Sequence, residues 1–412
     1  MGDGKVYDAL VVGAGPAGSF AAERLARGGA RVALFDGRPP DEPKACGGGV
    51  TSKALKAWPH LLEAAGKIIS EVEMYSPSGK HVRLKLAEPF AIYSRRAFDF
   101  FLRERAARAG AHIFTGRVTV AVRANDGGEW TVNSKNGERR TGRVLVAADG
   151  ANSSIARRLA GPLPPAEMEV AFGYRAPLPK AGNGPTVVAF LPGWAGYAWA
   201  FPRLDHISFG IATSQDTFDH RSLDRLLWDF MTGYYHVLVD KRAQLWSRGR
   251  LRQRGGLGEK YDGEIKQKLL VSVERYAARI PGLAPETWER RRVAGSNWAL
   301  LGDAAGFADP VTGEGIYYAL RSAELFAESY LGGQTATYED RWRADFGCDL
   351  RRASEMRRRF YGTFWGAPFT DRMIEFARLH RGIRRTLCEL VVGDQGYLNL
   401  KSILARRALW PL

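Results

Sequence analysis

Residues 13–18 (GAGPAG), near the N-terminus, fit the pattern G-x-G-x-x-G. Gly13, Gly15 and Gly18 allow a tight turn and bring backbone N–H groups at a helix N-terminus close to a pyrophosphate. Six residues alone are a weak signal, but the apolar stretch Tyr7–Val12 precedes them and a helical pattern follows. This segment therefore predicts a dinucleotide-binding turn between a strand and a helix.

Asp36 ends the next apolar stretch, 23 residues after Gly13. A carboxylate at this place can accept hydrogen bonds from the ribose hydroxyls of a dinucleotide. An acidic residue there, rather than a basic one, favours an unphosphorylated ribose. From these residues, the bound nucleotide could be either NAD or FAD.

Two later segments favour FAD. Residues 144–152 (VLVAADGAN) and 300–315 (LLGDAAGFADPVTGEG) each place an Asp beside a Gly after an apolar stretch. A carboxylate at a strand end can bind a ribityl hydroxyl, and a helix N-terminus stabilises a flavin ring that becomes anionic when it is reduced. One Asp-Gly pair is usually a simple turn, but three signals in this order predict a flavin site.

The elements that must position these motifs follow from the hydrophobic patterns. Strands are expected over residues 7–12 and 31–35 and near Ser296, with helices over 19–27 and 315–331 after the glycine motifs. Further strands are expected within 67–86, within 111–148 with a turn at Asp126-Gly127-Gly128, and within 167–214, and further helices over 95–109, 221–239, 260–279 and most of the last 80 residues.

The chain from Tyr7 to about Leu331 resembles the FAD-dependent oxidoreductases of the para-hydroxybenzoate-hydroxylase-like fold. Within them it is most similar to the geranylgeranyl reductase family. The residues that carry the resemblance are 44–49 (KACGGG), the helix start Arg95-x-x-Phe98-Asp99, 196–202 (GYAWAFP) and 302–306 (GDAAG).

The expected fold class is mixed α/β (α+β): a Rossmann-like FAD-binding domain, an inserted β-sheet substrate domain and a helical C-terminal region. The strand–helix unit near residue 300 lies far from the first one in the sequence, which indicates a discontinuous cofactor domain. We expect this FAD-binding domain in residues 1–160 and 290–332, the substrate domain in 161–289 and the helical region in 333–412.

The resemblance implies that FAD is the cofactor and assigns its contacts to particular residues. The glycine turn would hold the pyrophosphate and Asp36 the adenosine ribose, while the loop before residue 316, with Glu314, would lie by the flavin N1/O2 edge. The cofactor-binding residues implied in this way are Gly13, Gly15, Gly18, Asp36, Arg95, Val118, Asp303, Gly313, Gly315 and Ile316. The plainer alternatives are a surface ion pair for Arg95 and simple turns at Gly313 and Gly315.

Enzymes of the family that this chain resembles saturate isolated double bonds of prenyl chains, with reduced FAD as the hydride source. An unactivated alkene has no carbonyl to polarise, so the site must orient the alkene, supply a proton and exclude water. Tyr197, Trp199 and Phe201 alternate along an expected strand and point to one face. With Trp194 they could line an isoprenoid-like apolar substrate; the alternative is plain core.

Cys46 is the first candidate for the proton donor. By resemblance it lies near the flavin in a glycine-flanked loop, with Gly47 and Gly48 beside the substrate, and a thiol of pKa about 8.5 is a suitable weak acid. It could equally act as a redox partner, a steric gate or a small packing residue. Tyr197 and Glu314 are alternative catalytic proton sources.

Three other readings of the chain compete with a prenyl reductase. Residues 197–202 (YAWAFP) are similar to the W-x-W-x-I-P element of halogenases, so a flavin monooxygenase or halogenase acting on a small aromatic or natural product is the main alternative. A quinone-type dehydrogenase with an iron–sulfur cluster is not favoured, because Cys46, Cys348 and Cys388 lie far apart. No metal site is expected either.

The third reading, a nucleic-acid-binding protein, comes from the charge of the chain. There are 60 Lys+Arg against 44 Asp+Glu in 412 residues, a net charge of +16. Residues 341–412 hold 14 Arg and one Lys against 7 acidic residues, which is 15 − 7 = +8, and aromatic residues are interleaved with them. No nucleic-acid motif is present. The tail suits an anionic membrane surface or a diphosphate headgroup, and a solvated basic face is the alternative.

The expected cellular location and the possible electron donors follow from motifs that the sequence lacks. No signal peptide is evident, and the uncharged segment 181–202 contains four Gly and three Pro, so we expect strands and turns there and no transmembrane helix. A cytoplasmic protein, peripheral at a membrane, is therefore expected. No second glycine fingerprint marks an NADPH domain, which leaves transient NAD(P)H or a ferredoxin as the electron donor.

Overall fold

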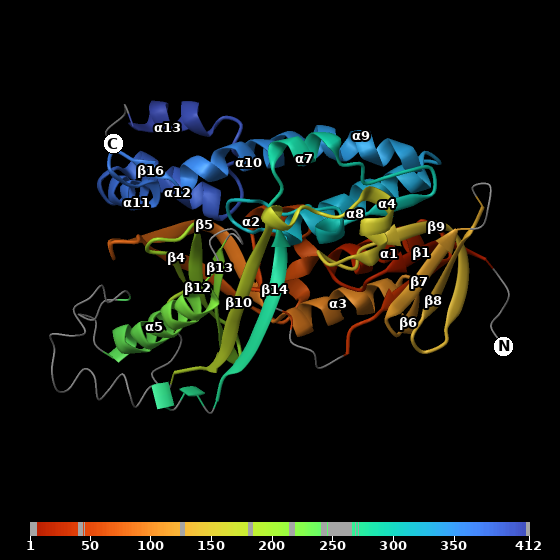
Figure 1. Ribbon diagram of the computed structural model, residues 1–412, viewed down its shortest axis with the longest axis horizontal. Helices are drawn as coiled ribbons and strands as arrows, with labels where there is room; N and C mark the ends of the chain where they lie inside the picture. Colours follow the sequence, from red (N-terminus) through yellow and green to blue (C-terminus); the bar gives the residue numbers. More distant parts are fainter. Residues whose placement is uncertain are drawn as a thin grey trace. The chain divides into compact units, whose positions relative to one another are not determined.

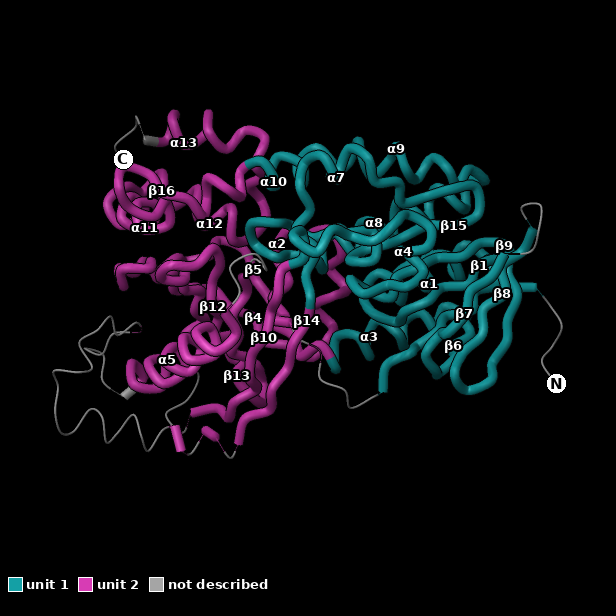
Figure 2. The backbone as a smooth tube through the Cα atoms, in the orientation of Figure 1, with its two compact units in different colours: residues 1–42, 96–168, 279–355 teal, residues 43–95, 169–278, 356–412 magenta. Residues whose placement is uncertain are grey.

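A computed structural model describes residues 6–39, 44, 46–123, 128–179, 184–213, 219–239, 245, 266–267, 269–270 and 272–408. The chain forms two compact units (Figure 2). The first unit comprises residues 1–42, 96–168 and 279–355, and the second comprises residues 43–95, 169–278 and 356–412.

The first unit is built on a seven-stranded sheet of order β6-β2-β1-β9-β8-β7, with β15 beside β9. The strands are β1 (Tyr7–Val12), β2 (Val32–Asp36), β6 (His112–Thr115), β7 (Val118–Arg123), β8 (Trp130–Ser134), β9 (Arg139–Ala147) and β15 (Trp298–Leu300). The neighbours β6, β2, β1, β9 and β15 are parallel, whereas β8 pairs antiparallel with β9, and β7 pairs antiparallel with β8. Apart from Asp8 and Asp36, strands β1 and β2 are apolar, because both faces of a parallel sheet are buried.

The helices of the first unit include the two that follow the glycine motifs. They are α1 (Pro16–Arg27), α3 (Arg95–Arg108, whose first residue belongs to the second unit), α4 (Ser154–Ala160), α7 (Pro285–Arg290), α8 (Ile316–Leu331) and α9 (Tyr338–Trp342). Helices α1 and α8 pack against each other (Figure 1), and Arg24 of α1 pairs with Glu324 of α8 at 3.0 Å. Because of this packing, two motifs nearly 300 residues apart in the sequence share one end of the sheet.

The second unit is built on an eight-stranded sheet of order β14-β10-β13-β12-β11-β4-β5-β3. The strands are β3 (Gly49–Val50), β4 (Gly66–Tyr75), β5 (His81–Tyr93), β10 (Met168–Pro177), β11 (Val187–Phe190), β12 (Gly196–Pro202), β13 (His206–Thr213) and β14 (Glu274–Pro281). Of the pairs with a defined register, only β11–β4 is parallel.

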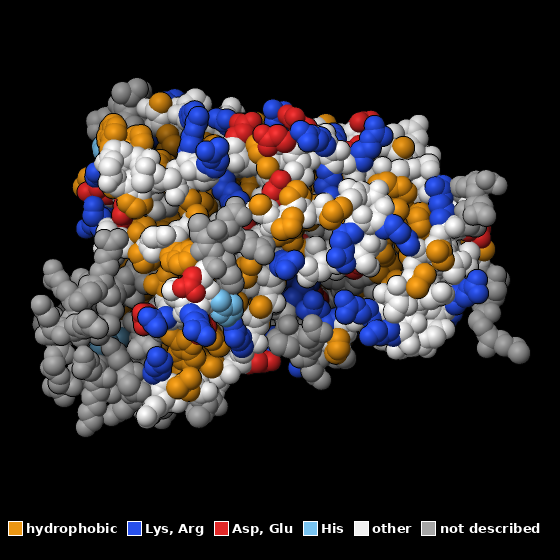
Figure 3. Space-filling view, in the orientation of Figure 1, with side chains coloured by type: hydrophobic (Ala, Val, Ile, Leu, Met, Phe, Trp, Pro, Cys, Tyr) orange, Lys and Arg blue, Asp and Glu red, His pale blue; other side chains and the backbone are white. Residues whose placement is uncertain are grey.

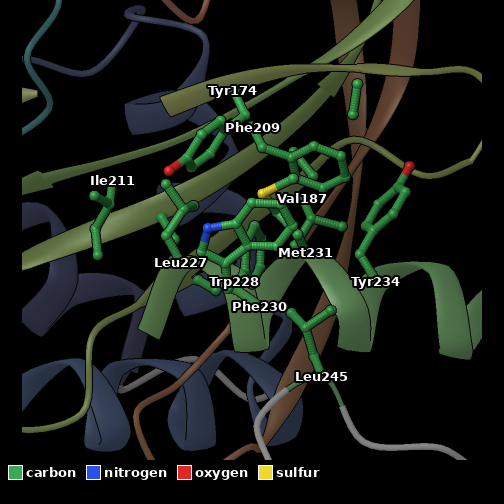
Figure 4. Packing of buried hydrophobic residues seen from close by; sticks show 14 of the residues in the cluster. Tyr174, Val187, Phe209, Ile211, Leu227, Trp228, Phe230, Met231, Tyr234 and Leu245 are labelled. Atoms are coloured by element: carbon green, nitrogen blue, oxygen red, sulfur yellow. The ribbon is translucent and has the colours of Figure 1, made fainter. Parts of the chain in front are cut away.

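Helices cover both faces of this second sheet. They are α2 (Ser52–Ala57), α5 (His220–Val239), α11 (Phe369–Leu379), α12 (Arg381–Val391) and α13 (Leu400–Ala408); helix α10 (Cys348–Phe360) leads into the second unit, and a hairpin of β16 (Thr363–Phe364) and β17 (Ala367–Pro368) follows it. Helix α5 packs on one apolar cluster with Phe209 and Ile211 (Figure 4). Helices α11 and α12 pack on another, with Leu84 and Ile92. Successive side chains of a strand point to opposite faces, so one strand can supply both clusters.

The compact units do not coincide with the domains expected from the sequence. Residues 43–95, which the expected boundaries place with the cofactor, supply β4 and β5, and β4 pairs with β11 in the second sheet. Residues 356–412, expected as a separate helical region, pack on the same sheet through α11 and α12. Pairing between strands more than 100 residues apart decides the division, and the local patterns carry no sign of it.

The helix expected over residues 260–279 is wrong over its last six residues, which belong to strand β14. Alanine and arginine give Glu274–Arg279 a helical composition, yet Tyr276 is buried while its immediate neighbours are exposed or half-buried. Pairing with β10 and the burial of that ring outweigh the intrinsic preference. Residues 260–265, 268 and 271 lie outside the described residues, as do Asp126 and Gly127 of the expected turn and residues 181–183. Among the described residues, every helix is too short or too polar to cross a membrane.

Candidate functional site

The glycine turn of the first unit leaves no room for larger residues. Gly13 follows β1 with φ +104°, and a Cβ added to it would lie 2.4 Å from the carbonyl oxygen of Ala148. A Cβ on Gly18 would lie 1.8 Å from the carbonyl oxygen of Gly13. Both distances are far below van der Waals contact. The turn and the segment after β9, two of the motifs predicted from the sequence, therefore touch through their backbones.

Helix α1 begins without a capping side chain. Its N-cap is Gly15, which makes no side-chain hydrogen bond, and its first turn contains Pro16 and no acidic residue. A helix N-terminus carries the positive end of the helix dipole, and its first N–H groups have no partner within the helix. This end of α1 therefore fits the pyrophosphate of a dinucleotide.

Asp36, at the end of β2, is held by an arginine that the sequence analysis missed. One of its carboxylate oxygens lies 2.5 Å from Nη1 of Arg103 on α3, and the other accepts from the backbone N–H of Arg38 at 3.2 Å. A carboxylate has about four acceptor directions, so ribose hydroxyls can still be accepted. Arg103 is one of several arginines on α3, and nothing in the sequence distinguished it.

Asp303 and the start of α8 come together in the first unit. A Cβ on Gly315 would lie 3.2 Å from Oδ1 of Asp303, and Gly315 caps the helix that begins at Ile316 without a side-chain hydrogen bond. Gly302, with φ +54°, lies between α1 and α8: its Cβ position is 3.2 Å from the Cβ atoms of both Ala17 and Ala319. The structure thus places the carboxylate beside a second uncapped helix N-terminus.

The loop before α8 is closed by a buried carboxylate. Asp309, which is 4% exposed, accepts from the N–H groups of Val311 at 2.7 Å and Thr312 at 3.0 Å. Gly313, with φ +70°, donates its N–H to the Asp309 carbonyl at 2.8 Å, and Glu314 is half-buried beside it. The sequence analysis missed Asp309, although an Asp that bonds to N–H groups just after it is a common turn former.

Arg291 is the third residue of the first unit, after Arg103 and Asp309, that was not predicted from the sequence. Its guanidinium is buried and donates to the carbonyls of Ala305 at 3.1 Å and Gly161 at 3.2 Å. Burial lowers its pKa, and the charge of Glu167 partly offsets this effect. Arg291 therefore joins the turn around Asp303 to the end of α4, and we regard it as a positioning residue.

Arg95 and Val118 lie apart from the glycine turn in sequence. Arg95 is 6% exposed, which does not suit an ordinary surface ion pair. Val118 begins β7 and lines a cavity of about 140 Å³ in the first unit, together with Thr119, Val120, Ala121, Ser154, Ile155 and Arg158.

In the second unit, a buried arginine holds the loop that contains Cys46. Nη2 of Arg203 donates to the carbonyl oxygens of Cys46 at 2.6 Å and Gly47 at 3.1 Å. Arg203 is 3% exposed, and burial is the main reason that its pKa is lowered, with further lowering by the charge of Arg95. Its Nε has no hydrogen-bond partner among the described residues. Arg203 was not predicted from the sequence; it lies two residues after Phe201, the last of the alternating residues Tyr197, Trp199 and Phe201.

A chain of hydroxyl groups supports the same loop. The Ser208 hydroxyl lies 3.4 Å from the Cys46 carbonyl and 2.7 Å from the Tyr276 hydroxyl, which donates to the carbonyl of Phe209 at 2.5 Å. Burial raises the pKa of Tyr276 to about 12. The Trp199 N–H reaches Ser208 at 3.5 Å. Three strands of the second sheet thus contribute to the position of Cys46.

The loop itself turns at glycine. Gly48 has φ +77°, and a Cβ on it would lie 2.1 Å from the carbonyl oxygen of Tyr93. The N–H of Gly48 donates to the half-buried sulfur of Cys46 at 3.3 Å. A Cβ on Gly47 would lie 3.0 Å from the ring of Phe201. The loop therefore lies directly against Phe201, one of the alternating aromatic residues of β12.

The structure separates the four predicted aromatic residues. Tyr197 and Trp199 are neighbours, with ring centroids 6.0 Å apart, and Tyr197 and Phe201 pack on the cluster covered by α11 and α12. Trp194 packs instead on the cluster covered by α5. Trp199 and Phe201 thus adjoin the Cys46 loop, whereas Trp194 does not share their cluster.

Comparisons with known proteins agree with this geometry. Residues 6–174 match the family model of an FAD binding domain. The chain is 31% identical to the geranylgeranyl diphosphate reductase of Rhodobacter capsulatus over 340 residues, which cover 78% of this chain and 74% of that protein. It is 30% identical to the enzyme of the same name from Synechocystis over 383 residues, which cover 87% and 82% of the two chains.

A solved structure is similar over nearly the whole length. It is that of a geranylgeranyl bacteriochlorophyll reductase-like protein of Thermoplasma acidophilum, with a TM-score of 0.69, 19% identity, and coverage of 98% of this chain and 96% of that chain. At this identity the likeness shows the fold alone, and it confirms the fold class predicted from the sequence.

Proposed function

Because the chain belongs to the geranylgeranyl reductase family of FAD-dependent oxidoreductases, we propose that it reduces carbon–carbon double bonds of a geranylgeranyl-type prenyl substrate. When bound, the reduced flavin supplies the hydride for this reaction. The observation that carries the proposal is the Cys46 loop, which is packed on Trp199 and Phe201 and held from behind by Arg203. An apolar wall beside a weak acid is what the saturation of an unactivated alkene requires.

The first unit supplies the contacts to FAD in this proposal. The uncapped start of α1 after Gly15 binds the pyrophosphate, and Asp36 accepts from the adenosine ribose. Asp303 accepts from the ribityl chain, and the N–H groups at the start of α8, after Gly315, stabilise negative charge on the ring. By the family resemblance, backbone atoms of Val118 contact the adenine, and Arg95, the one residue of this set that belongs to the second unit, lies near the phosphates.

We propose Cys46 as the proton donor to the substrate carbon that does not receive the hydride. Its sulfur is half-buried, and the N–H of Gly48 fixes its direction. Tyr197 and Glu314, both half-buried, are the alternative donors. A variant of the true donor loses the protonation step but keeps FAD, and this separates the three.

Two partners complete the proposal. Electrons come from NAD(P)H or from a ferredoxin. If the donor is an acidic ferredoxin that binds the basic surface, the rate of flavin reduction should fall as the ionic strength rises. The other partner is an anionic membrane surface, supported by the net charge of +8 in residues 341–412. Such a surface is where a lipid-like prenyl substrate is found.

The test is a single-turnover reaction without oxygen. Purified holoprotein is reduced and mixed with geranylgeranyl diphosphate, and flavin reoxidation is followed by absorbance while mass spectrometry follows the addition of hydrogen to the prenyl chain. Reoxidation that matches the hydrogen added supports the proposal. A product formed only with oxygen, and incorporating oxygen or halide, would overturn it in favour of a monooxygenase or halogenase.

A further inference from the structure

The hairpin of β16 and β17 has an unusual residue in its turn. Only Trp365 and Gly366 connect the two strands, whose register pairs Phe364 with Ala367. Their φ angles are +49° and +70°. Two positive φ angles define a turn in which Asn, Asp or Gly is normal. A large aromatic residue there is strained, because its Cβ approaches the backbone.

Packing within the chain does not explain this tryptophan. Trp365 is 74% exposed and Phe364 is 40% exposed. Their rings stack on each other with centroids 4.7 Å apart. The neighbouring aromatic residues Phe360 and Phe369 behave differently, since they pack on the core beneath α11 and α12. The strained residue thus presents its ring to the surroundings.

The tip of the hairpin is held in place from its base. Nη2 of Arg372 donates to the Trp365 carbonyl at 3.3 Å. The N–H of Phe369 donates to the carbonyl of Gly362 at 2.9 Å, which closes the hairpin just before α11. Two exposed rings on an anchored turn are positioned to contact another molecule or a membrane surface.

Uncompensated positive charge lies next to the hairpin. Arg358 and Arg359 end α10 and are exposed, and neither has an acidic partner among the described residues. Arg357, in the same turn of the helix, pairs with Glu169 at 2.7 Å. The N–H of Gly362 donates to the Arg359 carbonyl at 3.3 Å, so these arginines adjoin the start of the hairpin. In Figure 3, basic and acidic side chains are mixed along the upper edge of the visible face, and further basic side chains gather lower on it with few acidic ones beside them.

We propose that the β16–β17 hairpin is the element through which this chain binds an anionic lipid bilayer. Phe364 and Trp365 enter the boundary between headgroups and acyl chains, where tryptophan is favoured, and Arg358 and Arg359 meet the lipid phosphates. This inference rests on the proposed membrane association and names the surface that achieves it.

The experiment measures partitioning of the holoprotein onto vesicles by sedimentation. Vesicles of phosphatidylcholine mixed with phosphatidylglycerol are compared with vesicles of phosphatidylcholine alone. The double variant Phe364→Ser/Trp365→Gly removes both rings; glycine suits the positive φ at position 365 and offsets the loss of the Phe364–Phe369 ring contact, and the melting temperature checks that the fold is kept. We expect its partitioning to fall at least about tenfold. Arg358→Gln/Arg359→Gln should weaken partitioning roughly fivefold for each arginine.

Matched controls change the same chemistry elsewhere in the second unit. Ile68→Ser removes a side chain that is 51% exposed on β4, and Arg221→Gln/Arg225→Gln removes the same charge from α5. Both should bind vesicles as the wild type does.

Hairpin variants that bind vesicles as well as the wild type does would overturn the inference. Equal binding of the wild type to vesicles with and without phosphatidylglycerol would also overturn it. A hairpin-dependent change of oligomeric state without vesicles would assign the rings to a second copy of the chain and also overturn it. Reduction of detergent-dispersed geranylgeranyl diphosphate is measured in parallel. If that activity is absent while binding depends on the hairpin, the proposed reaction fails and the membrane inference stands.

Discussion

The glycine turn of the first unit and the Cys46 loop of the second are both sharp turns at glycine, but they are supported differently. The turn at Gly13 and Gly18 is enclosed mainly by backbone atoms, those of Gly13 itself and of Ala148 and Asp149 just after β9. The Cys46 loop meets backbone at Gly48, beside the Tyr93 carbonyl, but around Cys46 and Gly47 it is enclosed by side chains, among them Arg203, Phe201 and Ser208. A glycine enclosed by backbone atoms cannot be replaced by a larger residue without opening the turn. A loop held by side chains can be loosened gradually, by replacing one of those side chains at a time.

The largest effect is expected in the glycine turn. Gly18→Ala places a Cβ 1.8 Å from the Gly13 carbonyl oxygen, so the turn must open and FAD binding should fall by at least about a hundredfold. The measurement is the ratio of flavin to protein absorbance after purification, with FAD titration of the apoprotein. Gly137→Ala is the control: it has φ +78° but no atom within 4 Å of its Cβ, so it should cost only about 1 kcal/mol of stability and keep FAD. Normal FAD content in Gly18→Ala would refute this account.

The next effect tests the proposed chemistry of the loop. Cys46→Ser keeps a similar volume but removes the acidic thiol, and kcat for prenyl reduction should fall about a hundredfold while FAD content is unchanged. Tyr197→Phe and Glu314→Gln are measured beside it. If either of these loses more kcat than Cys46→Ser, the donor is that residue.

A smaller effect is expected when the support of the loop is weakened. Arg203→Met leaves the carbonyls of Cys46 and Gly47 without their donor, and should lower kcat about tenfold and accelerate alkylation of Cys46 by iodoacetamide. The rate is measured in a background of Cys348→Ser and Cys388→Ser, so that Cys46 is the only thiol. Arg203→Lys should recover part of the protection. Unchanged alkylation would show that Arg203 stabilises the sheet without positioning the loop.

The smallest effect concerns the hydroxyl chain behind the loop. Tyr276→Phe loses hydrogen bonds to Ser208 and Phe209 and should cost about 1 kcal/mol of unfolding free energy at neutral pH. The folded pKa of Tyr276 is about 12, above the unfolded value of about 10, so the folded state keeps a proton that the unfolded state loses between these values. This hydroxyl therefore lowers stability as pH rises from about 10 to 12.

The cost of Tyr276→Phe should accordingly shrink across that pH range, as denaturant titrations would show. Tyr234→Phe removes another buried hydroxyl, bonded to the Pro185 carbonyl, and serves as the control that should not alter alkylation of Cys46. A cost of Tyr276→Phe that grows with pH would contradict the sign of this linkage.

Much of the first unit could be predicted because its signals are local. Strand β1, the turn after it and helix α1 are contiguous in sequence, and each glycine has a steric reason that can be inferred from a pattern of six residues. Asp303 and Gly315 were also predicted from a short segment, and the structure places them side by side. Arg103 and Arg291 were missed because an arginine on a helix or in a loop has the same local pattern whether it pairs with a carboxylate, binds carbonyls or meets solvent.

The second unit was predicted less well, for the same physical reason. The alternation of Tyr197, Trp199 and Phe201 predicted a strand with one aromatic face, and this strand is present. That Phe201 adjoins Gly47, and that Tyr276 from β14 supports the loop, follows from strand pairing across more than 60 residues. Pairing of this kind also turned an expected helix into β14.

The sequence by itself determined the glycine turn after β1, the order of the motifs and the family, because these depend on patterns within short segments. Only the tertiary structure decided which side chains hold Cys46, which aromatic residues are core, and that Trp365 is exposed on an anchored hairpin. Those outcomes depend on burial and on contacts between distant segments, which no local pattern specifies.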